Sequence, residues 1–170
     1  GLNSLVKVFN RSGSPLPLTF HPFKKEYTGG VSVAAADVDG DGNDELIFGV
    51  LSQDEPHIKV LRGDSSQAVM GSFYAFSKQF KGGVNVTGGD VDNDGLAEII
   101  VAANSGGVPE VKAFKYDGRK TNVNFLAYEK EFSGGVQISS GDLDCDDQDE
   151  LVTIPSRKNI TGKVDRIEVD

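Results

Sequence analysis

Three short segments of this 170-residue chain concentrate acidic side chains at one repeated spacing. The first loop runs from Asp37 to Glu45, the second loop from Asp90 to Glu98, and the third loop from Asp142 to Glu150. Each has Asp at positions 1, 3 and 5 and Glu at position 9. Close carboxylates repel one another, each pair by about 1 kcal/mol in water and about 4 kcal/mol near a protein surface. A bound cation would convert this repulsion into attraction.

The chemistry of these side chains indicates which cation they suit. Every candidate donor is an oxygen, and neither His nor Cys takes part. Calcium accepts six to eight oxygens in flexible geometry, so the set suits calcium better than zinc or copper. An EF-hand is excluded because it needs Glu at position 12, where this chain has Phe48, Val101 or Thr153. We predict up to three structural calcium ions, whereas the alternative reading is a set of solvated surface turns.

The loops are part of a longer repeat. They begin 53 and 52 residues apart, and such a fixed period indicates a repeat architecture. An apolar segment returns with the same period, as Val6-Lys7-Val8-Phe9, Ile58-Lys59-Val60-Leu61, Val111-Lys112-Ala113-Phe114 and, more faintly, Val164-Asp165-Arg166-Ile167. We therefore predict one repeat domain over residues 1–170, with units at about 5–56, 57–110 and 111–163, and residues 164–170 starting a fourth unit.

The segments beside each loop have the composition of short strands. Before the first loop, Val31-Ser32-Val33 alternates apolar and polar residues, and after it Leu46-Ile47-Phe48 is apolar throughout. Alternation is typical of a half-buried strand, and a short apolar run of a strand covered on both faces. The equivalent segments Ile99-Ile100-Val101 and Leu151-Val152-Thr153 predict the same in the other units. Each loop should thus close a hairpin.

Each unit has room for four short strands, and no window shows sustained helical spacing. This predicts an all-β fold of β-propeller blades, each a four-stranded antiparallel sheet, in about three repeats of 52–53 residues. If the strand before the loop is innermost, the chain begins with the outer two strands of one blade, contains two whole blades and ends three strands into another. Propellers typically have four to eight blades. Further blades of a longer chain, or a homo-oligomer, would have to close the ring.

Glycine and aromatic residues also recur in every unit, before the strand that leads into the acidic loop. A Gly-Gly pair precedes each loop hairpin, where we expect a left-handed backbone or close approach. The pairs are at 29–30, 82–83 and 134–135. The aromatic residues before them are Phe20, Phe23 and Tyr27, then Phe73, Phe76 and Phe80, then Phe125, Tyr128 and Phe132. They could stack on sugars, but residues that recur in every unit favour packing between units.

The charge balance restricts the partners. The formal net charge is −9, which three calcium ions would reduce to −3. Without a stripe of Lys and Arg, the chain lacks the usual means of binding nucleic acid or an anionic membrane surface. No stretch reaches the length of a membrane span. The single cysteine, Cys145, can form no internal disulfide and does not indicate a redox compartment.

The loops and the segments around them resemble the FG-GAP and VCBS repeats, the calcium-loop propeller blades also found in integrin α-subunit heads. The resemblance covers nearly the whole chain. The resemblance implies calcium ligands from the side chains at positions 1, 3, 5 and 9 and from the carbonyl at position 7. These are Asp37, Asp39, Asp41, Asn43 and Glu45; Asp90, Asp92, Asp94, Leu96 and Glu98; and Asp142, Asp144, Asp146, Gln148 and Glu150. The third loop departs from the family pattern because Asp147 replaces glycine at position 6. We expect that site to be the weakest or most distorted.

The resemblance implies a non-enzymatic, calcium-binding β-propeller module for extracellular or cell-surface adhesion, which binds a protein or glycan without membrane insertion. The alternatives are part of a propeller-based polysaccharide-active enzyme and a purely structural repeat segment. Because loops that vary on a rigid scaffold usually carry binding, we expect partners at the irregular connectors 50–56, 103–109 and 155–162, at the end opposite the acidic loops. Arg62-Gly63-Asp64 matches a tripeptide that many integrins recognise, but ordinary turn chemistry is the simpler interpretation.

Overall fold

The computed structural model describes residues 4–156, and their regular structure is entirely β. The prediction of an all-β fold is therefore confirmed for this part of the chain. No helix among these residues is long and apolar enough to cross a membrane. The strands are β1 (Val6–Phe9), β2 (Pro15–Phe20), β3 (Val31–Ala36), β4 (Glu45–Val50), β5 (His57–Leu61), β6 (Val69–Tyr74), β7 (Val84–Gly89), β8 (Glu98–Ala103), β9 (Glu110–Phe114), β10 (Lys120–Leu126), β11 (Val136–Gly141) and β12 (Glu150–Pro155).

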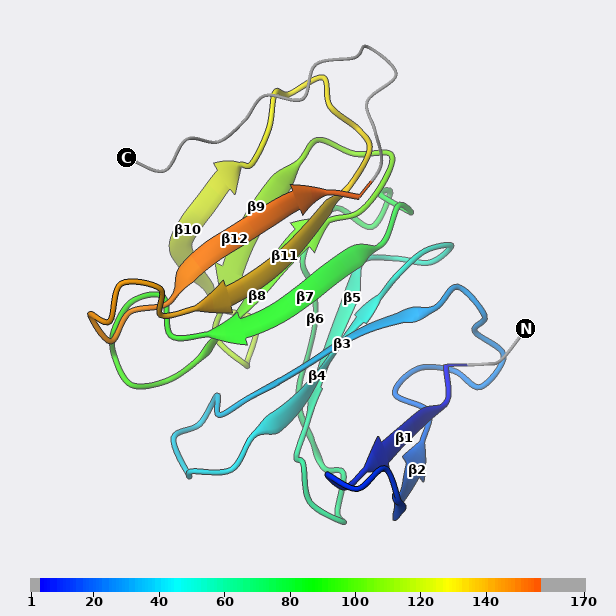
Figure 1. Ribbon diagram of the computed structural model, residues 1–170. Helices are drawn as coiled ribbons and strands as arrows, with labels where there is room; N and C mark the ends of the chain where they lie inside the picture. The colour runs from blue at the N-terminus through cyan, green and yellow to red at the C-terminus, as the bar shows by residue number, and fades with distance from the viewer. Residues whose placement is uncertain (1–3, 157–170) are drawn as a thin grey trace.

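The strands form four antiparallel sheets in the order of the chain (Figure 1). Two are four-stranded, β3-β4-β5-β6 and β7-β8-β9-β10, and in both every strand pairs with the next one in sequence. The remaining two are the hairpins β1-β2 and β11-β12. By their place in the repeat, β1 and β2 correspond to the last two strands of a four-stranded sheet, and β11 and β12 to the first two. The predicted third strand at 164–167 lies outside the described residues.

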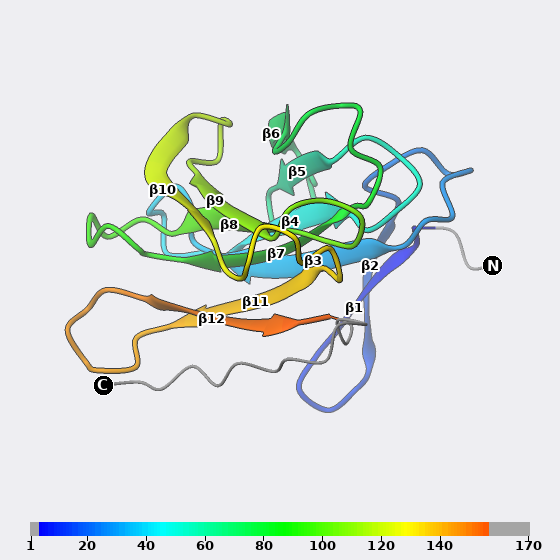
Figure 2. The same ribbon diagram turned by 90° about the horizontal axis from the view of Figure 1, so that it is seen from above.

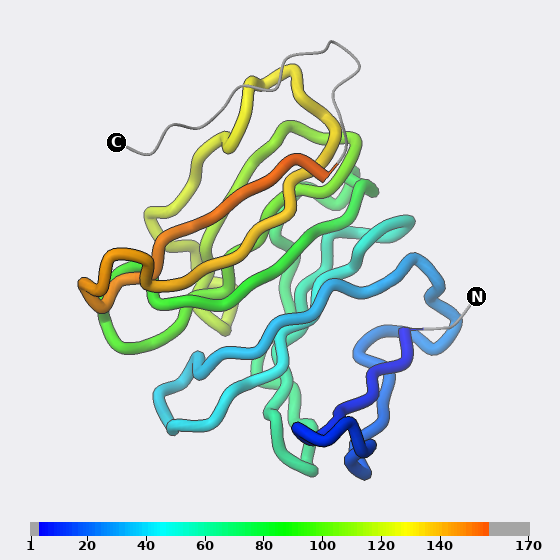
Figure 3. The backbone as a smooth tube through the Cα atoms, in the orientation of Figure 1, coloured from blue at the N-terminus to red at the C-terminus, as the bar shows by residue number. Residues whose placement is uncertain are grey.

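The first strands of successive sheets meet. Strand β7 lies between β3 and β11 and contacts both (Figure 1). Ser32 Oγ on β3 accepts a hydrogen bond of 3.1 Å from the Val86 amide on β7, and Asn85 Nδ2 on β7 donates to the Val136 carbonyl on β11 at 2.7 Å. The three loop hairpins therefore stand next to one another, and their acidic loops lie in a row at the same end (Figure 3).

The second strand of each four-stranded sheet, β4 or β8, lies at the centre of the core, where a neighbouring sheet covers it. Every residue of β8 is buried, and Ile47 and Phe48 of β4 are fully buried. The prediction of a strand covered on both faces is thus right for β4 and β8 but wrong for β12, whose Val152 and Ile154 are 45% and 54% exposed. The β11-β12 hairpin is the last described layer of the molecule, so one of its faces lacks a neighbour among residues 4–156 (Figure 2).

The prediction for the recurring glycines is confirmed, and the prediction for the aromatics is confirmed in part. Gly30, Gly83 and Gly135 all have left-handed backbones, with φ between 82° and 88°. The Phe73 ring on β6 lies 5.1 Å from that of Phe114 on β9 of the next sheet, and Phe20 on β2 makes an edge contact with Phe48 on β4. Phe20 and Phe73 therefore pack neighbouring sheets together, whereas Phe125 is 41% exposed. Other repeated aromatics pair within their own units: Phe23 with Tyr27, Phe76 with Phe80 and Tyr128 with Phe132.

Strand register places the connectors away from the acidic loops. In the first hairpin Ala36 pairs with Glu45 beside the acidic loop, and Val31 pairs with Val50 at the other end. Residues 50–56 and 103–109 thus leave the sheets at the end opposite the loops, as predicted, and the connector at 155–162 lies mostly outside the described residues. Part of the first connector is structural, since Tyr27 donates its phenol O–H to the Ser52 carbonyl at 2.7 Å.

Candidate metal centres

Each acidic loop closes one hairpin of first and second strands. The last paired residues are Ala36 with Glu45, Gly89 with Glu98 and Gly141 with Glu150. Positions 1 to 8 of each loop therefore leave the sheet, whereas the glutamate at position 9 is the first residue of the second strand. Because successive side chains of a strand point to opposite faces of the sheet, the register of the hairpin fixes the face on which this glutamate lies. The loop must fold back over it.

Within each loop the three aspartates converge. Each offers one carboxylate oxygen, and the three oxygens lie within 4.8 Å of one another. Two ligands of one calcium ion, at 2.3–2.6 Å from the metal, can be no more than about 5 Å apart, so each set fits a single ion. The sets are Asp37, Asp39 and Asp41; Asp90, Asp92 and Asp94; and Asp142, Asp144 and Asp146.

Hydrogen bonds from the loop backbone hold the aspartates in place. In the first loop, Asp37 accepts from the amides of Gly40 and Gly42 at 2.7 and 2.8 Å. Asp41 accepts from the side chain and amide of Asn43, which lowers the pKa of the Asp41 carboxyl. Such side-chain bonds to the following backbone are a property of Asp in turns. Much of the arrangement of the carboxylates thus comes from hydrogen bonds within the loop itself.

The glutamates at position 9 lie beneath the loops. Glu45 and Glu98 are 1% and 0% exposed. Their Oε2 atoms accept hydrogen bonds from the position-2 amides, Val38 at 3.3 Å and Val91 at 3.1 Å. Burial raises the pKa of both carboxyl groups. Since a buried carboxylate is costly unless it is paired, these two residues mark positions where a positive charge stabilises the fold.

The third loop repeats this backbone without glycine at position 6. Asp147 adopts φ of 69°, close to the 83° of both Gly42 and Gly95. Its amide reaches Asp142 Oδ2 at 3.3 Å, whereas the Gly42 and Gly95 amides make the equivalent bond at 2.8 Å. The nearby carboxylate of Asp146 raises the pKa of Asp144. The third loop thus differs from the others by a longer hydrogen bond rather than by a different turn, and its weaker binding of calcium stays a prediction.

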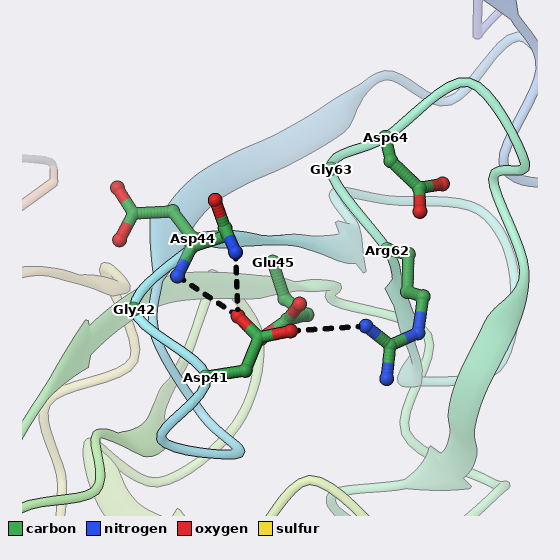
Figure 4. Close-up of a pocket in the computed structure, with 8 residues that line it drawn as sticks. Asp41, Gly42, Asp44, Glu45, Arg62, Gly63 and Asp64 are labelled. Atoms are coloured by element: carbon green, nitrogen blue, oxygen red, sulfur yellow. Dashed lines mark hydrogen bonds and ion pairs between the residues drawn. The ribbon is translucent and has the colours of Figure 1, made fainter.

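Two basic residues reach into the first and second loops, and the sequence motif did not point to them. Lys115 Nζ lies 2.7 Å from Asp94 Oδ2 and 3.4 Å from Asp92 Oδ2, and it also donates to Glu98 Oε1. Arg62 contacts Asp39 and Asp41, each at 3.2 Å. Figure 4 shows its contact with Asp41. Both basic residues follow the third strand of their sheet, 53 residues apart. A basic residue at one position of the repeat was the sequence signal.

Neighbouring loops are also joined directly. The Ala97 amide of the second loop donates to the Asp37 carbonyl of the first at 3.0 Å, and the Asp149 amide of the third donates to the Asp90 carbonyl of the second at 2.7 Å. Gln148 Nε2 adds a bond to the Val91 carbonyl at 2.8 Å. The three candidate centres therefore form one continuous row, in which each loop supports the next.

The tripeptide Arg62-Gly63-Asp64 lies beside the first loop. Together with residues 41–45 it lines a cleft of about 580 Å³ (Figure 4). Arg62 is bound to the loop aspartates, and Asp64 accepts from the Ser66 hydroxyl and amide, bonds that lower its pKa. Both charged side chains thus have local partners, which favours the turn interpretation.

Two further side chains singled out by composition lie outside the centres. Cys145 is exposed at position 4 of the third loop, and only its amide bonds to Asp142. His57 begins β5 at the connector end, where its ring stacks on Tyr74 at 4.8 Å and bonds to Ser72. Neither side chain belongs to the acidic clusters of the described residues that could hold a metal ion.

Comparisons with known proteins add no relative. No protein-family model matches the sequence, and a search of curated proteins found no match. The resemblance to FG-GAP and VCBS repeats therefore rests on the spacing of residues in the sequence alone and stays a prediction.

Proposed function

We propose that this chain is a non-enzymatic, calcium-binding β-propeller module whose calcium ions are structural. One observation carries the proposal: the same three carboxylates converge in the same loop of three successive hairpins, at a separation that fits one calcium ion. Isolated acidic turns are common on protein surfaces. Here, however, glutamates beneath two of the loops add negative charge in the buried interior, where an unpaired charge costs most.

The order of the strands supports the propeller interpretation. The two four-stranded sheets run from first to fourth strand in sequence order, and the first strands meet side by side. Blades arranged around an axis would have this strand order and these neighbours, which supports the proposal. The described chain has only two complete sheets, so closing a ring requires further blades. We propose that these come from a longer chain or from another copy of this one.

Removing calcium tests the function. In excess EDTA we expect a lower Tm than in saturating calcium, because each ion stabilises the folded chain by about 0.4 kcal/mol when its Kd equals the free concentration and by about 2.7 kcal/mol when binding is a hundredfold tighter. For a domain of this size, each kcal/mol shifts Tm by about 2–4 °C. Differential scanning calorimetry measures the shift.

A matched variant separates binding at the loops from general ionic effects. The triple substitution Asp39→Ala, Asp92→Ala and Asp144→Ala removes one predicted ligand from each loop, so its Tm should respond little to calcium. If the unmodified chain melts at the same temperature in both buffers, the loops do not bind calcium and the proposal fails.

We further propose that a protein or glycan binds at the connector end, in an extracellular or cell-surface setting. Gln53, Asp54 and Val108 are exposed there. On a glycan and protein array, the variant Q53A/D54A/V108A should lose at least about tenfold in signal, since truncated contact residues often cost more than 1 kcal/mol each. Arg119→Gln, an exposed change at the loop end, should bind as the unmodified chain does. The reverse pattern would place the binding surface at the acidic loops.

A further inference from the structure

Lys115 holds the position at which a metal ion would sit in the second loop. Its ammonium nitrogen lies 2.7 Å from Asp94 and 3.4 Å from Asp92 and bonds to buried Glu98. These residues supply three of the four side chains in the predicted ligand set. The lysine side chain is only 21% exposed, so it packs against the loop rather than extending into solvent.

We propose that Lys115, and Arg62 at the equivalent position of the preceding unit, are internal counter-cations: each neutralises its loop without calcium and must leave when calcium binds. The inference rests on the proposed calcium function and identifies residues that tune it. A calcium ion bonded to Asp94 and Glu98 at 2.3–2.6 Å would occupy the space of the ammonium group. Two cations cannot share this site, so binding is an exchange.

The exchange links two parts of each sheet. Lys115 directly follows β9 and Arg62 directly follows β5, so each basic side chain connects the turn between the third and fourth strands to the loop between the first and second. Calcium therefore frees that turn from the loop as it binds. In the first unit the freed turn is Arg62-Gly63-Asp64, which would then present its guanidinium to solvent.

The third loop offers an internal control. Among residues 4–156 no basic side chain forms an ion pair with Asp142, Asp144, Asp146 or Glu150. In the sequence, the position 53 residues after Lys115 is Glu168, an acidic residue. Removing Lys115 should therefore change calcium affinity at the second loop and leave the third loop nearly unchanged.

Lys115→Met tests the inference, because it keeps the length of the side chain and removes its charge. Calcium titration followed by ¹⁵N NMR resolves the loops through the amides of Gly42, Gly95 and Asp147. We expect affinity at the second loop to rise at least about tenfold, the change that corresponds to no longer breaking one hydrogen bond between charged groups. The third loop should change by less than about twofold. Arg62→Gln should do the same at the first loop, with a smaller gain because Arg62 is 39% exposed.

Thermal melting provides a readout that does not need calcium. In EDTA, Lys115→Met should lower Tm because the buried Glu98 loses its ammonium partner, whereas in saturating calcium its Tm should equal or exceed that of the unmodified chain. Arg119→Gln, which removes a charge from the same turn without touching the loop, should alter neither. A purely structural lysine would lower Tm equally in both buffers, and that result, or unchanged affinity at the second loop, overturns the inference.

The two proposals fail in different ways. If no loop of the unmodified chain or of Lys115→Met binds calcium, the calcium function is wrong and the exchange with it. If the loops bind calcium but Lys115→Met binds no more tightly, only the counter-cation role is wrong. If the second loop binds calcium in Lys115→Met alone, the inference is supported and the calcium function is confined to loops without a basic side chain.

Discussion

Gly83→Ala should lower the free energy of unfolding by about 3 kcal/mol. Two costs combine. Gly83 has φ of +82°, which an L-residue adopts only under strain. A Cβ atom there would also lie 1.9 Å from the Leu51 carbonyl oxygen and 2.1 Å from its carbon. Because both are backbone atoms, the sheets β3–β6 and β7–β10 would have to move apart.

Gly106→Ala is the matched control for this substitution. Gly106 has φ of +93°, yet a Cβ atom there would meet nothing within 4 Å. This variant bears the backbone strain alone and should lose about 1 kcal/mol. Urea unfolding followed by circular dichroism measures both. Equal losses in the two variants would show that the sheets tolerate the methyl group, and that the contact between Gly83 and the 51–52 connector does not determine their spacing.

The sequence predicted the repeating parts of the fold because each rests on local chemistry that recurs. A hairpin follows from the alternation in Val31-Ser32-Val33 and the apolar run after the loop, and both β3 and β4 form there. The left-handed glycines follow from the requirement for φ > 0 or close approach. Carboxylates spaced by two residues converge because the short loop must turn tightly to connect two paired strands. None of these inferences needed knowledge of distant contacts.

What the sequence could not predict depends on neighbours. The apolar run Leu151-Val152-Thr153 matches its equivalents in composition, yet Val152 is 45% exposed because burial requires an adjoining sheet. Lys115 and Arg62 look like ordinary turn residues, since their partners lie 17 to 23 residues earlier in the chain. The hydrogen bonds between neighbouring loops could not be predicted either, because backbone amides donate them and every residue except proline has such an amide.

Glu98→Ala should lower the free energy of unfolding by about 3 kcal/mol in EDTA, because it breaks a buried ion pair by removing one partner. The Glu98 side chain is 0% exposed, and it bonds both to the Val91 amide and to Lys115. Without it, the amide loses its acceptor under the loop and Lys115 keeps only the more exposed Asp92 and Asp94. Calcium should restore little of this loss, since Glu98 is also a predicted ligand. Urea unfolding in EDTA and in calcium measures both effects.

Glu150→Ala distinguishes burial and charge pairing from the hydrogen bond that all three loops share. Glu150 also accepts the position-2 amide, that of Leu143 at 2.7 Å, but it is only partly buried and forms no ion pair among the described residues. In EDTA it should cost about 1 kcal/mol, the usual contribution of one hydrogen bond. In calcium the cost should grow, because the third loop then loses a ligand. Equal losses for both variants in EDTA would mean that the Glu98 carboxylate contributes only through its bond to the loop backbone, and that Lys115 gives the second loop no stability that the third loop lacks.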